Sequence, residues 1–327
     1  MRRLIAALSL CVLLFSAGFA ESVPPQAAES TPAPVSQLPA VMEQGGTLFV
    51  VNGKNRISKA YAPEDLVKPD VQTRKKSLEN NILMQREAAK ALEKMFEAAL
   101  HEKGHTLYAT SGYRAYGIQQ LLFSAKVEEV GSKEKASRRV AAPGTSEHQL
   151  GLAMDVQSPS QLNLNPRFGQ TPEGIWVGEN AHRFGFIVRY KQEWRDITGV
   201  SDEPWHIRYV GVAHATALFH LDIPLETYTA YAQLLPEYVL NRGNHYLLEG
   251  LIGQMMAGKT PEALSDLRQA DAPGQDAAMR AASAPFLPEG TSYDQAVWYA
   301  YPTPRPTSAP RVDEDEETSL FAQAGGK

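Results

Sequence analysis

The feature of this chain that most constrains its fold is a long amphipathic segment, residues 77–104. Its apolar residues recur at intervals of three and four, and Gly104 ends the pattern, as is typical of a helix followed by a glycine cap. The segment therefore predicts a core helix. Its buried face is expected to contain Ile82, Leu83, Ala88, Leu92, Met95, Phe96 and Ala99.

The segments that follow this helix favour an α+β domain. Residues 106–114 predict a strand and residues 115–131 a second helix that ends at Gly131. Further short patterns predict strands at 47–52, 151–157, 186–190 and 204–210, and helices at 174–185 and 212–221. Together they fit one compact domain, residues 44–235, within a chain of 327 residues that is 43% apolar.

The C-terminal part is expected to be an appendage. Residues 236–300 carry amphipathic patterns that predict one or two helices, and we expect this extension to be dispensable for catalysis. Residues 301–327 combine prolines with an acidic run, which predicts a disordered tail.

The N-terminus predicts export to the cell envelope or the extracellular space. Residues 1–20 combine a basic start, an apolar run and small residues before a cleavage site after Ala20, a pattern typical of a secretory signal. An uncleaved membrane anchor is the alternative. Residues 21–43 are rich in Pro, Ala and Ser and predict a flexible linker. The single cysteine, Cys11, lies in the apolar run, so cleavage leaves no thiol, and hydrolytic chemistry must use oxygen and nitrogen groups.

Charge excludes one class of partner. The formal net charge is −5 and the basic residues are scattered, which does not support nucleic-acid binding. Contact with a membrane is expected only through the signal or an uncleaved anchor. No sequence feature indicates an oligomeric state.

Two short motifs carry candidate chemistry. The stretch GTSEHQLGLAMD sets His148 seven positions before Asp155, and DEPWHIRYVG sets Glu203 three positions before His206. Two imidazoles and one carboxylate form a ligand set for a divalent metal that keeps a position open for water. Glu203 is then left to take a proton from metal-bound water and to deliver it to a leaving amine.

The same motifs carry a resemblance to a known family. SEHQLGLAMD fits S-x-H-x-x-G-x-A-x-D and EPWHIRYVG fits E-x-W-H-x-R-Y, the paired signatures of VanY-type D-alanyl-D-alanine carboxypeptidases, which belong to a wider group of zinc peptidases with VanX and the hedgehog domain. The chain resembles this family from about Thr47 to about Leu235. The resemblance implies an α+β fold in which a small antiparallel sheet with flanking helices carries a zinc site.

The resemblance also implies roles for single residues. It implies that His148, Asp155 and His206 bind Zn²⁺ and that Glu203 is the catalytic base. It implies that Arg114, in SGYR, reaches either the developing oxyanion or the C-terminal carboxylate of the substrate, two tasks that a guanidinium suits equally.

Three further positions resemble residues that line or support the family's substrate site. They are Ser146, Gln119 and Trp205. Each has a structural alternative: Ser146 as a turn cap, Gln119 as a solvent-facing helix residue, and Trp205 as a packing residue.

The expected activity is removal of a terminal D-amino acid from peptidoglycan stem peptides outside the cytoplasmic membrane. An L,D-carboxypeptidase or a cross-bridge endopeptidase with the same mechanism is the near alternative, because pocket shape decides between these substrates. A non-haem iron oxygenase would also use two histidines and a carboxylate, but it has no need of Glu203 and usually sets its first two ligands two residues apart. A non-catalytic zinc-containing wall-binding module is the third alternative.

Overall fold

The computed structural model describes residues 38–74 and 82–300. The predicted signal, most of the predicted linker and the predicted tail lie outside the described residues. Residues 38–43, which the sequence assigns to the linker, contain the short 3₁₀ helix Ala40–Met42, and the Met42 side chain is buried. Within the described ranges, no helix combines the length and the apolar character needed to cross a membrane.

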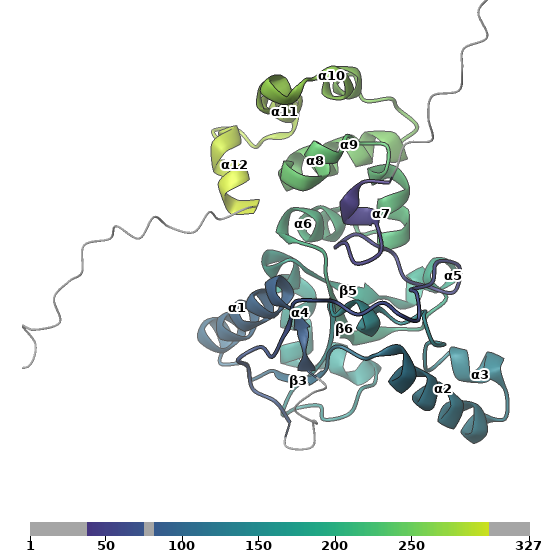
Figure 1. The fold of residues 1–327 in the computed structure, drawn as a ribbon. Coiled ribbons are helices and arrows are strands. Elements are labelled where there is room, and N and C mark those ends of the chain that lie inside the picture. The colour runs from purple at the N-terminus through teal and green to yellow at the C-terminus, as the bar shows by residue number, and fades with distance from the viewer. Residues whose placement is uncertain (1–37, 75–81, 301–327) are drawn as a thin grey trace, which may run out of the picture. The chain divides into compact units, whose positions relative to one another are not determined.

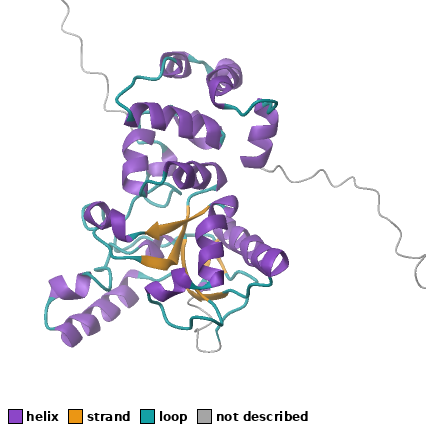
Figure 2. Cartoon of the chain, turned by 180° about the vertical axis from the view of Figure 1, so that it is seen from behind, coloured by secondary structure: helices purple, strands orange, loops and turns teal. Residues whose placement is uncertain are grey.

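A four-stranded antiparallel sheet forms the centre of the fold (Figure 2). Its strands follow the spatial order β3-β4-β6-β5, with bounds Tyr108–Ser111, Ala153–Gln157, Glu203–Tyr209 and Phe186–Tyr190. A two-stranded antiparallel sheet pairs β1 with β2, which span Leu66–Val67 and Met84–Gln85. The predicted α+β class with a small antiparallel sheet is confirmed.

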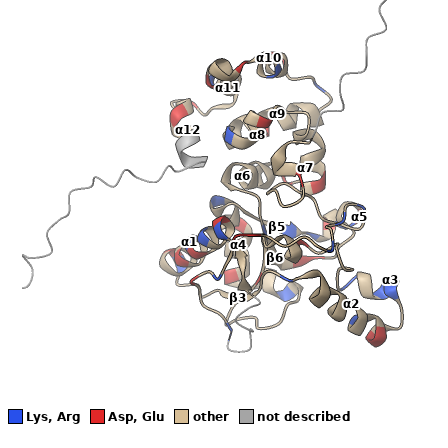
Figure 3. Cartoon of the chain, viewed as in Figure 1, with Lys and Arg blue, Asp and Glu red and all other residues tan. Residues whose placement is uncertain are grey.

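Helix α1 spans Arg86–Lys103 and ends as predicted. Gly104 adopts φ 69°, the left-handed conformation that glycine reaches without a steric penalty. One face of α1 is buried in the core, and the exposed face carries interspersed acidic and basic residues (Figure 3). The predicted start at residue 77 is wrong, because Met84 and Gln85 pair with β1 in an extended conformation before the helix begins.

The strand predicted at residues 47–52 is absent from this described segment. Leu48 and Val51 are buried as a strand pattern would require, but the backbone forms turns. The carbonyl oxygens of Thr47 and Phe49 accept hydrogen bonds from the Arg208 guanidinium at 2.9 and 3.1 Å, so a side chain replaces the neighbouring strand as their donor.

The remaining helices surround the sheet and extend beyond it (Figure 1). The second predicted helix is confirmed as α2, and Gly131 caps it with φ 78°. Between α2 and the end of β6 lie short helices. The bounds are α2 Tyr116–Val130, α3 Lys133–Ser137, α4 Pro172–Asn180 and α5 Arg195–Thr198.

Residues 236–300 contain helices α8 to α12, more than the one or two predicted, and they follow α6 and α7 of the predicted domain. Gly243 and the Asn244 cap separate α8 from α9, and Gly258, with φ 73°, ends α9. The bounds are α6 Val212–Leu221, α7 Leu225–Ala232, α8 Glu237–Arg242, α9 His245–Met256, α10 Ala263–Gln269, α11 Gln275–Ser283 and α12 Tyr293–Ala300.

Two hydrophobic clusters hold these elements. The first packs α1, α4 and one face of the sheet. The second begins with Met42 and Leu48 and joins residues 210–235 to α8, α9, α10 and α11. The boundary that the sequence suggests after residue 235 therefore falls inside a continuous core, because α6 packs directly on α9.

Candidate metal centre

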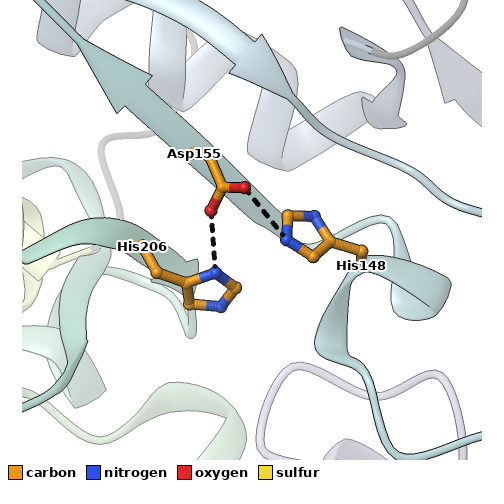
Figure 4. A group of neighbouring side chains, drawn as sticks. All are labelled: His148, Asp155 and His206. Atoms are coloured by element: carbon orange, nitrogen blue, oxygen red, sulfur yellow. Dashed lines mark hydrogen bonds and ion pairs between the residues drawn. The ribbon is translucent and has the colours of Figure 1, made fainter. Parts of the chain in front are cut away.

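The pairing of β4 with β6 brings the two sequence motifs together. Asp155 and His206 are direct cross-strand partners, so their side chains lie on the same face of the sheet. Asp155 Oδ1 lies 3.0 Å from His206 Nδ1 (Figure 4). The two residues are separated by 51 positions in sequence, and the register of the sheet alone makes them neighbours.

His148 approaches Asp155 from a 3₁₀ turn, Glu147–Leu150, that immediately precedes β4. Gly151 ends this turn with φ 70°, and a Cβ atom there would lie 2.8 Å from Leu66 Cδ2. The position therefore requires glycine for its backbone conformation, and a Cβ atom would in addition displace the end of the Leu66 side chain. Nδ1 of His148 lies 2.8 Å from the carbonyl oxygen of Gly112, so Nδ1 carries the hydrogen and donates it. The other nitrogen, Nε2, faces Asp155 Oδ2 at 3.4 Å (Figure 4).

This trio is suited to a cation. One ligand atom from each of His148, Asp155 and His206 lies within 4.8 Å of the others, and all three residues are buried. Burial lowers the pKa of His148 and keeps its imidazole neutral. Burial by itself would raise the pKa of Asp155, but the two histidines hold it well below its usual range, so the carboxylate is ionised. Two imidazole nitrogens and a carboxylate are donors that zinc accepts.

Glu203 lies at the start of β6, opposite Tyr190 of β5. Burial raises the pKa of Glu203 to about 7, and although His206 opposes this shift, the negative charges of Asp155 and Glu147 add to it. A carboxyl group with such a pKa can both accept and release a proton near neutral pH.

Arg114 lies just after β3 and is held in place from three directions. Its backbone N–H donates to the carbonyl oxygen of His148 at 3.0 Å. Its guanidinium donates to Ser111 Oγ at 2.8 Å and to Gln119 Oε1 at 2.7 Å. Gln119 is buried, and its amide donates to the carbonyl oxygen of Ala141 at 2.6 Å, so in this structure it supports Arg114 and does not face solvent.

All of the predicted site residues line one cavity of about 770 Å³. Ser146 accepts no hydrogen bond as a cap of the turn that follows it, and Trp205 is partly exposed in the cavity wall. The cavity also contacts residues outside the predicted set, among them Arg138, Arg139, Tyr190 and Leu164. The structure thus brings the eight predicted residues into a single space.

Sequence reasoning missed one group of charged residues behind the trio. Glu147 contacts His206 and the guanidiniums of Arg189 and Arg208, and all four side chains are buried. Burial alone would raise the pKa of Glu147, but the two arginines hold it well below its usual range. The available signal was an arginine in the middle of each of two apolar strands, FIVRY and HIRYV, because a buried guanidinium requires a buried partner.

Comparisons with known proteins relate this chain to carboxypeptidases. A family model described as VanY, D-alanyl-D-alanine carboxypeptidase, matches residues 81–212. The chain is 43% identical over 195 residues to YodJ of Bacillus subtilis (strain 168), a protein named for a carboxypeptidase activity, and the match covers 59% of this chain and 71% of YodJ. It is 37% identical over 194 residues to the D-alanyl-D-alanine carboxypeptidase of Enterococcus faecalis (strain ATCC 700802 / V583), covering 57% of this chain and 66% of that protein.

A solved structure is also similar. The LdcB LD-carboxypeptidase superposes with a TM-score of 0.53 at 43% sequence identity, covering 55% of this chain and 84% of LdcB.

Proposed function

Because this chain belongs to the VanY family of D-alanyl-D-alanine carboxypeptidases, we propose that it removes the terminal D-alanine from peptidoglycan stem peptides with the aid of a bound zinc ion. The chain is a peptidase. The observation that carries the proposal is the convergence of His148, Asp155 and His206 in a cavity that also contains Glu203.

The donor set supports zinc as the cofactor. His148 Nε2, His206 Nδ1 and one Asp155 oxygen would hold the ion, a set of three protein ligands that leaves a position for substrate or water. When bound, zinc supplies Lewis acidity, which polarises the scissile carbonyl and increases the acidity of water.

In the proposed reaction, Glu203 moves the proton. Its carboxylate accepts a proton from the water that attacks the scissile carbonyl carbon, and a C–O bond forms. The same proton then passes to the leaving nitrogen as the C–N bond breaks, which releases D-alanine as a neutral amine before it equilibrates with solvent. The partly buried position of Glu203 and its pKa of about 7 support both transfers.

We further propose that Arg114 binds the substrate. Its guanidinium lies in the cavity wall and is preorganised by Ser111 and Gln119, so it meets a substrate anion at little entropic cost. Either the C-terminal carboxylate or the oxyanion suits it. Ser146 and Trp205 line the same cavity and are proposed as substrate contacts, and Gln119 as the support of Arg114.

The relatives favour two substrates. The Enterococcus faecalis relative is named for D-alanyl-D-alanine, whereas LdcB is an LD-carboxypeptidase of 43% identity. A mass-spectrometric digest of the purified protein should therefore compare a stem pentapeptide ending in D-Ala-D-Ala, a tetrapeptide ending in one D-Ala, and a cross-linked dimer, each with and without a chelator.

We expect chelator-sensitive loss of one alanine from the pentapeptide. Loss from the tetrapeptide alone would move the assignment to an L,D-carboxypeptidase, and cleavage of the dimer alone to an endopeptidase. Zinc binding without cleavage of any substrate would contradict catalysis and favour a wall-binding module.

We also propose that the protein acts outside the cytoplasmic membrane, where these substrates occur. The support is the signal-like sequence of residues 1–20, which lies outside the described residues. Fractionation of expressing cells, with N-terminal sequencing of the product, tests this: protein confined to the cytoplasm with an intact N-terminus would contradict export.

A further inference from the structure

Glu147 is a fully buried carboxylate whose two oxygens have different partners. Oε1 accepts from Arg189 Nε and from Arg208 Nη1, each at 2.9 Å. Oε2 lies 3.3 Å from Nε2 of His206. The Glu147, Arg189 and Arg208 side chains are 0% exposed, so no water competes for these contacts. The two arginines thus hold Oε1 of Glu147 in place, and Oε2 is left to accept a hydrogen bond from His206.

Both ring nitrogens of His206 face ionised carboxylates in this structure, Nδ1 facing Asp155 and Nε2 facing Glu147. The contact with Glu147 holds a hydrogen on Nε2, so Nδ1 is the nitrogen that can give up its hydrogen and bind a metal. A carboxylate held between two guanidiniums can only accept hydrogen bonds, so Nε2 of His206 must donate. In a neutral imidazole the electron pair is then on Nδ1. Nδ1 is the nitrogen that faces Asp155 inside the trio, at 3.0 Å from Oδ1. His148 is oriented in a comparable way, but by the backbone carbonyl oxygen of Gly112.

The anchor of Glu147 extends to helix α7. Arg189 donates from Nη1 and Nη2 to the two carboxylate oxygens of Glu226, at 3.0 and 2.7 Å, a bidentate pair. Glu226 lies on α7, beyond residues 81–212 that match the family model. A continuous path of charged contacts therefore runs from α7 through Arg189 and Glu147 to His206.

We propose that Glu147 is a positioning residue that orients His206 for metal binding through Nδ1, and that Glu226 on α7 holds Glu147 in place through Arg189. The proposal rests on the proposed function, because it assumes that the trio binds a metal. It gives α7, which lies beyond the residues matched by the family model, a part in building the site. In metalloproteins, removing an outer carboxylate partner of a ligating histidine typically costs about 10- to 100-fold in metal affinity or activity.

The test is zinc affinity, measured on the full chain by competition with a chromophoric chelator. In Glu147→Gln, the amide oxygen is expected to remain with the arginines while its NH₂ turns toward His206, which forces the hydrogen onto Nδ1. We expect zinc affinity to fall about 10- to 100-fold. Glu226→Gln should lower it by about three- to tenfold, at or below the lower end of that range, because it acts through Arg189.

Glu249→Gln is the matched control. It removes a carboxylate that lies 3.0 Å from a different histidine, His220, on the surface. Zinc affinity should not change. The visible spectrum of the Co²⁺-substituted protein provides a second readout: its ligand-field bands should change in Glu147→Gln and remain unchanged in the control.

Separate outcomes identify which idea fails. Wild-type protein that binds neither ion would contradict the proposed metal site itself. Wild-type binding with unchanged affinity and spectrum in folded Glu147→Gln would overturn the positioning role. If Glu147→Gln does not fold, Glu226→Gln decides, and wild-type affinity in that variant would overturn the path through α7.

Discussion

At the scale of single residues, the cavity separates charged groups by their environment. Partial burial and the neighbouring carboxylates raise the pKa of Glu203 to about 7, whereas Asp155 faces two imidazoles and remains ionised. Two carboxyl groups of one cavity are thus prepared for different tasks, proton transfer and ligation.

Replacement of Glu203 should separate catalysis from metal binding. Glu203→Gln preserves shape but cannot accept a proton, so we expect kcat to fall by about 100- to 10,000-fold. Zinc content, measured by atomic absorption, should stay at the wild-type level because Glu203 is not one of the proposed ligands. Glu193→Gln changes an exposed carboxylate and serves as the control. Full turnover in Glu203→Gln would exclude the base proposed here.

The raised pKa of Glu203 predicts the pH dependence of the rate. A base works only when deprotonated, so kcat/KM should fall as the pH drops below about 7. A bound cation stabilises the carboxylate, so the midpoint should lie at or below this value. Asp202 adds to the upward shift, and Asp202→Asn should therefore move the midpoint of the pH profile to lower pH. A midpoint that moves to higher pH in this variant would contradict the assignment.

At the scale of elements, the site depends on two backbone features that place side chains. The antiparallel register of β4 and β6 makes Asp155 and His206 direct neighbours. The tight turn that ends at Gly151 places His148 next to the same two residues. The backbone N–H of Gly151 donates to the carbonyl oxygen of His148 at 3.2 Å, which closes this turn.

Substitution of Gly151 should weaken both the fold and the metal site. A left-handed alanine costs roughly 1–2 kcal/mol, and the new Cβ atom would also overlap Leu66. We expect Gly151→Ala to lower the free energy of unfolding in urea by at least this amount and to weaken zinc binding. Gly178→Ala is the matched control. Gly178 lies in helix α4 with open space at its Cβ position, so alanine there should stabilise by about 0.5–1 kcal/mol. Equal effects of the two substitutions would refute the structural requirement.

At the scale of the whole molecule, the C-terminal helices share a core with the segment that precedes them. Leu247, Leu248, Leu251 and Ile252 of α9 are buried in the cluster that also contains Leu218 and Leu225. The sequence predicted that residues 236–300 are dispensable for catalysis; the shared core adds the prediction that they contribute to the stability of the fold.

Truncation tests this arrangement directly. A chain that ends at Leu235 loses at least four fully buried aliphatic side chains, on the order of 6–12 kcal/mol of burial at about 1.5–3 kcal/mol each. That loss is comparable to the whole stability of a typical domain. We expect the truncated chain to be insoluble or to lack a cooperative thermal transition. A chain that ends at residue 300 keeps every described helix and should retain the wild-type Tm. A stable and active chain ending at Leu235 would show that residues 236–300 are dispensable, as the sequence predicts.

The sequence by itself determined the chemistry and the local elements. It supplied the candidate ligands and Glu203 in two short motifs, and Arg114 in the separate segment SGYR. It also supplied the ends of α1 and α2 at Gly104 and Gly131, because caps and periodicity depend on neighbours within a few positions. Only the tertiary structure revealed contacts between distant segments. Glu147 meets Arg189 and Arg208 across 42 and 61 positions, and the C-terminal helices meet the rest of the core in the same way. Such contacts depend on strand register and helix packing, which no local pattern encodes.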